Sequence, residues 1–220
     1  MELISALLGA VMTVTIAYIG AAALRSWKTE EYAFKDAFPR LPWEDKGWLC
    51  VLALSAIGWF FSALLHVRPV PAMILDVLLL ASMTVLCQID RKMHIIPNRL
   101  LLIMLGGWLT VIAAAVIFET EFGIALAFTG IGGALIAGAA FFLCYLISQR
   151  QIGGGDVKLS LIMGLYLTNA RVMGAVIYGV FACCLYTVVL LMIKKITLKD
   201  GIPLVPFLYL GVLLVMLVVG

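Results

Sequence analysis

The chain has 220 residues, of which 65% are hydrophobic and 12% are charged, and its mean hydropathy is +1.16. A soluble domain could not bury that much apolar surface, so the composition excludes soluble globular classes and predicts an all-α integral membrane protein. The formal net charge of +3 adds little to this. We expect contact with membrane lipid and no nucleic-acid partner.

Eight apolar segments follow one another along the chain. A membrane-spanning helix needs about 20 apolar residues. The segments are Leu3–Leu24, Trp48–His66, Val70–Ile89, Arg99–Phe118, Ile124–Ile147, Val157–Thr168, Val172–Ile193 and Pro203–Val219. The sequence therefore predicts a polytopic helical bundle of about eight transmembrane segments, with residues 1–220 forming a single membrane domain.

The sixth segment, Val157–Thr168, is short. Its residues cover roughly 18 Å as a helix, less than the roughly 30 Å of the hydrocarbon core. It is expected to be a half-helix, or to extend at its ends while the preceding glycines dip inward. Because short or broken backbone at membrane depth is tolerated where it lines a cavity, this favours a site beside Asp156.

Residues 25–47 form the only long polar stretch, and aromatic residues are interspersed among its charges. It is either an interfacial connector whose aromatic rings rest at the headgroups, or a cytosolic arm that contacts substrate. With the N-terminus outside, every lysine and arginine except Arg68 and Arg171 falls on an inside connection. The positive-inside rule therefore predicts that Asp90 and Asp156 both lie on the cytosolic side.

Asp90 and Asp156 are the candidate functional residues. Asp90 closes an apolar run, and Asp156 follows the glycines Gly153, Gly154 and Gly155 at the expected N-terminus of the next helix. Carboxylates at the boundary of such an apolar chain indicate a functional site. Three successive glycines are typical of backbone that must bend freely or that another segment approaches closely.

The connection after Asp90 contains Pro97 and Asn98. The proline restricts the residue before it to extended geometry, and Asn98 is expected to cap the following helix. On position alone, Asp90 is as consistent with an ordinary interfacial charge neutralised by Arg91 or Lys92 as with a functional role.

If the two aspartates face each other across a wet pocket, repulsion between like charges makes them share a proton. One carboxylate then takes a proton from water while the other protonates the scissile carbonyl oxygen, which gives peptide hydrolysis without a metal or cofactor. The alternative from another class is a small ion-coupled transporter that uses both aspartates as proton or cation ligands. A non-catalytic membrane assembly factor is a third possibility.

Other polar groups fit the chemistry less well. Asp76 lies about 21 Å from Asp90 along one helix and is expected to serve packing or local hydrogen bonding. His66 and His94 form no zinc motif, so no metal site is expected. The cysteines are expected to be buried small hydrophobes rather than metal ligands or disulfides: Cys50, Cys87, Cys144, Cys183 and Cys184.

The motifs resemble those of a known family. Gly153-x-Gly155-Asp156 resembles the GxGD signature of membrane aspartic proteases, and its continuation to Val157-Lys158-Leu159 is similar to that of type IV prepilin peptidases and preflagellin peptidases. Asp90 ahead of Ile96-Pro97-Asn98 resembles the first catalytic motif of that family. The run from Ile202 to Gly211, with Pro203 and Pro206, is similar to its proline-rich helix start. The resemblance covers residues 90–211, and we expect a peptidase core at 70–211.

The resemblance implies an aspartic endopeptidase that removes the basic leader of type IV prepilins or pilin-like secretion proteins, in a prokaryotic cell membrane with its site facing the cytosol. Asp90 and Asp156 would be the catalytic pair. Gly153, Gly154, Gly155, Lys158, Pro97, Asn98, Pro203 and Pro206 would form the surrounding substrate-binding loops. The longer members carry paired CxxC motifs after the first helix, whereas residues 25–47 contain no cysteine. The resemblance therefore implies a peptidase without the methyltransferase region.

Overall fold

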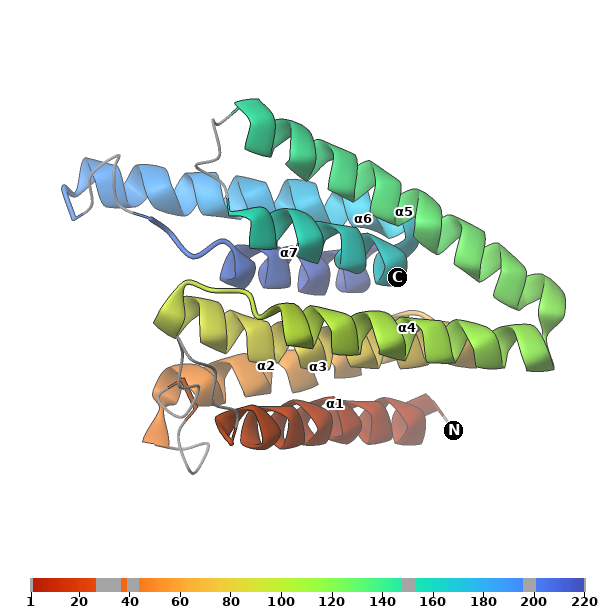
Figure 1. Ribbon diagram of the computed structural model, residues 1–220. Coiled ribbons are helices and arrows are strands. Elements are labelled where there is room, and N and C mark those ends of the chain that lie inside the picture. Colours follow the sequence, from red (N-terminus) through yellow and green to blue (C-terminus); the bar gives the residue numbers. More distant parts are fainter. Residues whose placement is uncertain (1, 27–36, 39–43, 148–152, 196–200, 220) are drawn as a thin grey trace.

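The computed structural model describes residues 2–26, 37–38, 44–147, 153–195 and 201–219. These residues form seven helices: α1 (Glu2–Arg25), α2 (Lys46–Leu65), α3 (Val70–Met93), α4 (Asn98–Phe118), α5 (Thr120–Ile147), α6 (Gly154–Met192) and α7 (Val205–Val218). Six of them are long and apolar enough to cross a membrane, and α7 is a shorter apolar helix. The predicted all-α membrane architecture is confirmed, and the helices run along a common direction except α5, which is tilted across the others (Figure 1). Most of the polar connector at residues 25–47 lies outside the described residues.

Helix α6 accounts for two of the eight expected segments. As one straight helix its 39 residues would measure roughly 58 Å, about twice the hydrocarbon core. Thr168 interrupts it, with φ 62° and ψ 176°, and the chain doubles back there (Figure 1). We call residues 154–167 the outgoing arm and residues 169–192 the return arm. The outgoing arm begins at Gly154 rather than Val157, so the short sixth segment extends through the glycines, which was one of the two expectations.

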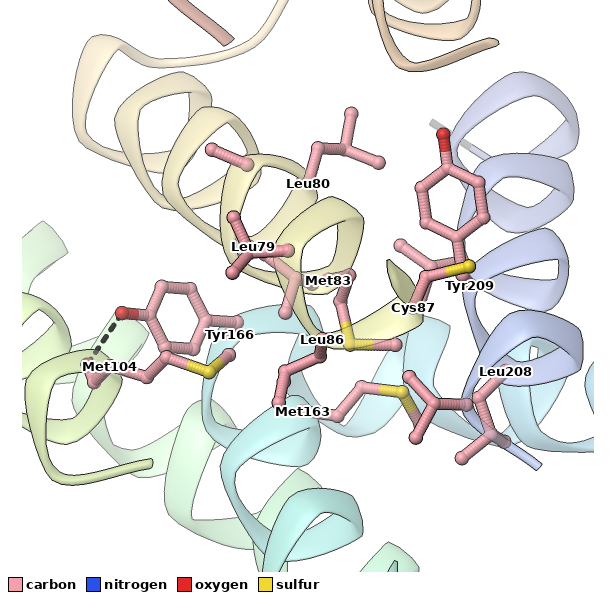
Figure 2. Packing of buried hydrophobic residues seen from close by; sticks show 14 of the residues in the cluster. Leu79, Leu80, Met83, Leu86, Cys87, Met104, Met163, Tyr166, Leu208 and Tyr209 are labelled. Atoms are coloured by element: carbon pink, nitrogen blue, oxygen red, sulfur yellow. Dashed lines mark hydrogen bonds between the residues drawn. The ribbon is translucent and has the colours of Figure 1, made fainter. Parts of the chain in front are cut away.

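Helix α3 lies at the centre of the bundle and is the most enclosed of the long helices described. Figure 2 shows its side chains Leu79, Met83 and Leu86 pointing into a core shared with the other helices. Met163 and Tyr166 from α6 and Leu208 and Tyr209 from α7 fill the same core. Since apolar surface is shared among α3, α4, α6 and α7, the residues at both ends of α3 are held in fixed positions.

Glycines let α5 and the outgoing arm of α6 meet backbone to backbone. A Cβ placed on Gly164 would lie 2.5 Å from the amide nitrogen of Ala134, and one on Gly133 would lie 2.5 Å from the carbonyl oxygen of Gly164. Close approach of this kind, made possible by small residues, is how membrane helices gain packing energy without a hydrophobic driving force between them. The outgoing arm, and Asp156 with it, is therefore held by α5.

Adding one methyl group at this interface should loosen it. We expect Gly164→Ala to destabilise the protein by about 1–3 kcal/mol, because the backbone of α5 has to move aside. Gly106→Ala on α4 is the matched control, since nothing lies within 4 Å of its added Cβ, and it should be neutral or stabilising by up to about 1 kcal/mol. Thermal unfolding in detergent measures both, and equal unfolding temperatures would contradict the close packing.

An ion-pair cluster joins the helices at the end of α3 away from Asp90. Asp76 is fully buried and pairs with Arg68, and its Oδ2 also accepts a hydrogen bond of 3.1 Å from Arg171 Nη1, while its Oδ1 forms an ion pair with Arg171 Nη2 at 3.0 Å. Arg68 also donates to Ser62 Oγ at 2.9 Å and to the carbonyl oxygen of Met216 at 3.1 Å. The expected local hydrogen bonding of Asp76 is found at Arg68, eight residues before it, and the fold adds Arg171, which lies 95 residues away on α6.

A second polar network lies at the opposite end of α3, around Asp45. Its carboxylate caps α2 by accepting from the backbone N–H groups of Gly47 and Trp48 at 2.9 and 3.3 Å. It also binds Lys92 Nζ at 3.0 Å and Gln88 Nε2 at 3.1 Å. Burial by itself would raise the pKa of Asp45, but these hydrogen bonds outweigh it and hold the pKa well below its ordinary value. The carboxylate therefore fastens the start of α2 to the last turns of α3.

The low pKa of Asp45 gives stability a pH dependence. A depressed carboxyl pKa contributes stability that is present above the ordinary value of 3.8 and is lost as pH falls below it. We expect Asp45→Asn, which keeps a good capping residue but removes the charge, to lose about 1–2 kcal/mol at pH 7. The gap between parent and variant in thermal unfolding should shrink as the pH falls below 4. A gap that is constant down to pH 2.5 would contradict the role assigned to the charge.

The cysteines only partly follow the expectation. Cys87 is buried, Cys183 is half-buried, and Cys50, Cys144 and Cys184 are exposed on the helix surfaces, so the prediction of five buried residues is wrong. The sequence periodicity does not separate the lipid-facing from the core-facing side of such uniformly apolar helices. All five are free thiols.

Candidate active site

Asp90 lies in the last turn of α3. The helix continues past it to Met93 and ends at His94, which adopts a left-handed conformation with φ 54° and donates its backbone N–H to the carbonyl oxygen of Asp90 at 2.9 Å. Asp90 is 6% exposed, whereas its neighbours Arg91 and Lys92 form ion pairs with Asp45, the residue that caps α2. Asp90 is therefore not neutralised by the adjacent cations, which was the alternative considered for it.

Asp156 lies in the first turn of α6, at the start of the outgoing arm, as the sequence predicts. Its backbone N–H donates to the carbonyl oxygen of Gly153 at 3.0 Å, which closes the first turn of the helix. The side chain is half-buried. A carboxylate at this position faces the unpaired N–H groups and the positive end of the helix dipole.

The fold brings these two carboxylates together. Asp156 is close enough to Asp90 for their charges to interact, although the residues belong to different helices and are separated by two further helices in sequence. Asp90 Oδ2 also accepts a hydrogen bond of 3.0 Å from the backbone N–H of Val205, at the start of α7. The site is thus built from the ends of three helices that meet at one end of the bundle.

The three glycines before Asp156 have different surroundings. A Cβ on Gly155 would lie 3.1 Å from Cβ of Ile96, and one on Gly153 would lie 3.1 Å from the carboxylate of Asp156. Nothing lies within 4 Å of a Cβ on Gly154. The close approach expected from the glycines is therefore found at Gly155, where the connection after Asp90 packs against the start of α6.

Lys158 and Asn98 link the same two segments. Lys158 Nζ donates to Asn98 Oδ1 at 3.0 Å, which connects the outgoing arm of α6 with the start of α4. The expectation that Asn98 caps its helix is wrong. Helix α4 begins at Asn98, Pro97 occupies the capping position without a side-chain hydrogen bond, and the side-chain oxygen of Asn98 is turned to Lys158. A proline there is compatible with a helix start because of its fixed φ.

The proline-rich run reaches the site through its backbone rather than its rings. Pro203 precedes α7 and Pro206 is its second residue, and Val205 between them makes the contact with Asp90. Sequence reasoning had missed this group. Its position at a helix start could have indicated it, because the first N–H groups of a helix have no acceptor within the helix. Among the described residues, no group of three His, Cys, Asp or Glu side chains is arranged to hold a metal ion.

The fold and site define a polytopic helical membrane protein whose paired carboxylates lie at one end of its bundle. The model of the type IV leader peptidase family matches residues 77–188, just over half of the chain. The chain belongs to this family, and it is a protease of the leader peptidase type. Searches of curated proteins and of solved structures found no match. Family membership favours the peptidase over the ion-coupled transporter considered as the alternative.

Proposed function

We propose that this protein is an aspartic endopeptidase that cleaves the basic N-terminal leader from type IV prepilins or pilin-like proteins at the cytosolic face of a prokaryotic cell membrane. The observation that carries the proposal is that Asp90 and Asp156, from two different helices, lie within range of each other's charge at one end of the bundle, where Ile96 packs against Gly155. The family match, which includes both residues, supports the same conclusion.

The geometry supports a dyad mechanism. One carboxylate accepts a proton from a water molecule, whose oxygen attacks the scissile carbonyl carbon, and the protonated carboxyl group donates its proton to the carbonyl oxygen. Collapse of the tetrahedral intermediate breaks the C–N bond. The leaving amine takes up the proton that the first carboxylate accepted from water, and the second carboxylate recovers a proton from a hydroxyl group of the intermediate. Two neighbouring carboxyl groups that share one proton have the acid and the base that this reaction needs.

The substrate would approach along the surface around the dyad. Lys158 and Asn98 hold the start of α4 against the start of α6, and Gly155 allows Ile96 to pack closely beside Asp156. These contacts fix the start of α6 relative to the connection between α3 and α4. We propose that Gly153 and Gly154, which are exposed, leave the backbone near Asp156 open to an extended peptide.

The cytosolic orientation rests on charge. The helix ends around the dyad carry the cations Arg91, Lys92 and Lys158, and the opposite end carries Arg68 and Arg171. Lysine and arginine are enriched on the cytosolic side of membrane proteins, so we assign the end with the dyad to that side. Residues 70–211 are proposed as the peptidase core, within a single membrane domain of residues 1–220 and with the 25–47 segment as a cytosolic loop.

Leader cleavage by the purified protein tests the proposal. The protein in detergent would be incubated with a pilin-like substrate that carries a basic leader, with and without EDTA, and the product would be sized and sequenced. Cleavage at the end of the leader in the presence of EDTA supports a peptidase that needs no metal. If the folded parent cuts no such substrate, the result favours the non-catalytic assembly factor.

A further inference from the structure

The N-terminus of α7 touches the proposed catalytic pair, although it lies beyond the matched residues 77–188. We propose that the backbone N–H of Val205 is a positioning group that holds Asp90 in the orientation required for cleavage. This inference rests on the proposed function. Under this proposal α7 is part of the peptidase site. Its contribution is a main-chain group, which a search for side-chain motifs does not reveal.

The contact has the properties expected of a positioning group. The nitrogen of Val205 lies 3.0 Å from Asp90 Oδ2, and Val205 is fully buried while Asp90 is 6% exposed. A hydrogen bond to a carboxylate is roughly twice as strong as one between neutral groups, and burial protects it from competing water. Because Oδ2 is held in this way, Oδ1 is the oxygen left for exchange of a proton with water.

Of the first two residues of α7, only Val205 has a backbone N–H. Val205 is the first residue of α7, and Pro206 has no N–H. The next donors, Phe207 and Leu208, are used within the chain, since both donate to the carbonyl oxygen of Leu204 at 3.0 and 3.1 Å. The proline-rich sequence therefore leaves a single free donor at this point of α7, and Asp90 accepts its hydrogen bond.

Helix α7 is itself held firmly enough to position another group. Gly211 brings it into backbone contact with Ala175 on the return arm of α6. Tyr209 Oη donates to the carbonyl oxygen of Val51 on α2 at 3.0 Å and also lies 2.6 Å from Ser55 Oγ. Since α7 is fixed against both α2 and α6, its first N–H is fixed relative to α3 as well.

Replacement of one amide by an ester tests the role without changing a side chain. Incorporation of the α-hydroxy analogue of valine at position 205 removes the N–H and keeps the isopropyl group. We expect kcat for leader cleavage to fall roughly 10- to 100-fold while KM stays within about twofold of the parent, because Asp90 loses its orientation but the substrate surface is unchanged.

The matched control is the same ester substitution at Phe207. It removes an N–H from the same turn of α7, but one that donates to Leu204 rather than to Asp90. It should leave kcat within about twofold of the parent, with an unfolding temperature similar to that of the ester at 205. An effect that comes only from weakening α7 would lower kcat in both ester variants equally.

Two results would overturn the inference. One is an ester at 205 that cleaves as fast as the parent, and the other is an equal loss of kcat in the two ester variants. A parent protein that cuts no leader is a different result, because it refutes the proposed function and the positioning role together. Parent activity therefore distinguishes failure of the inference from failure of the function on which it rests.

Discussion

Asp90→Asn and Asp156→Asn should each reduce leader cleavage by roughly 10²- to 10⁴-fold, the usual contribution of a positioned acid or base. Asparagine has nearly the same shape as aspartate, and at position 90 its side-chain oxygen can still accept from the N–H of Val205. The fold should therefore survive while proton exchange is lost. Initial rates with a purified pilin-like substrate, beside unfolding temperatures of both variants, measure the effect.

The double variant sharpens this test. If the two carboxyl groups work as one unit, Asp90→Asn combined with Asp156→Asn should lose no more activity than either change alone. Asp45→Asn is the matched control, because it removes a carboxylate near the same end of α3 whose partners are Lys92 and Gln88 rather than the dyad. It should cleave at close to the parental rate. A dyad variant that retains a tenth of the parental rate would refute the assignment.

Asp76→Ala should produce the largest loss of stability, about 3–5 kcal/mol. Removal of one partner from a buried ion pair leaves an uncompensated charge, and here two guanidinium groups, on Arg68 and Arg171, would lose their only shared carboxylate. Both arginine side chains are 10% exposed, so little water is available to replace it. A loss of this size corresponds to a fall of roughly 10 °C in the unfolding temperature.

A triple variant separates the loss of a partner from the loss of the cluster. Asp76→Leu combined with Arg68→Met and Arg171→Met replaces all three charges with apolar side chains of similar length. Buried ion pairs exchanged as a set for hydrophobic residues are often as stable as the original. We therefore expect the triple variant to unfold at a higher temperature than Asp76→Ala. A triple variant that is less stable than the single one would show that the ion pairs themselves stabilise the bundle.

The cluster around Asp76 also explains how the dyad is kept in place from a distance. Asp76 and Asp90 lie on the same helix about 21 Å apart. Arg171, at the start of the return arm of α6, binds the far end of α3, while Asp156, at the start of the outgoing arm, lies beside its near end. The two arms of α6 are thus placed against opposite ends of α3, so a slip of α3 past α6 would break the ion pair and separate the carboxylates.

The membrane class, the all-helical architecture and the family could all be predicted from the sequence. These follow from local properties: long apolar runs must form helices in lipid, because every backbone polar group has to be satisfied there. The same properties placed Asp156 at a helix start after its glycines, and the short sixth segment marked the reversal found at Thr168. Expectations failed where they depended on the surroundings, as at Asn98, whose side chain binds Lys158 instead of capping its helix.

The pairing of polar groups, in contrast, depends on how the helices pack and could not be predicted. Arg171, one of the two partners of Asp76, lies 95 residues away from it, and the N–H that binds Asp90 lies 115 residues away, and no periodicity or propensity encodes such a contact. Uniformly apolar helices also give no sign of which face is turned to the core, so the exposed cysteines could not be told from the buried Cys87. The physical reason is the same in each case: helix formation in a membrane is a local event, whereas the pairing of buried charges depends on how the finished helices pack.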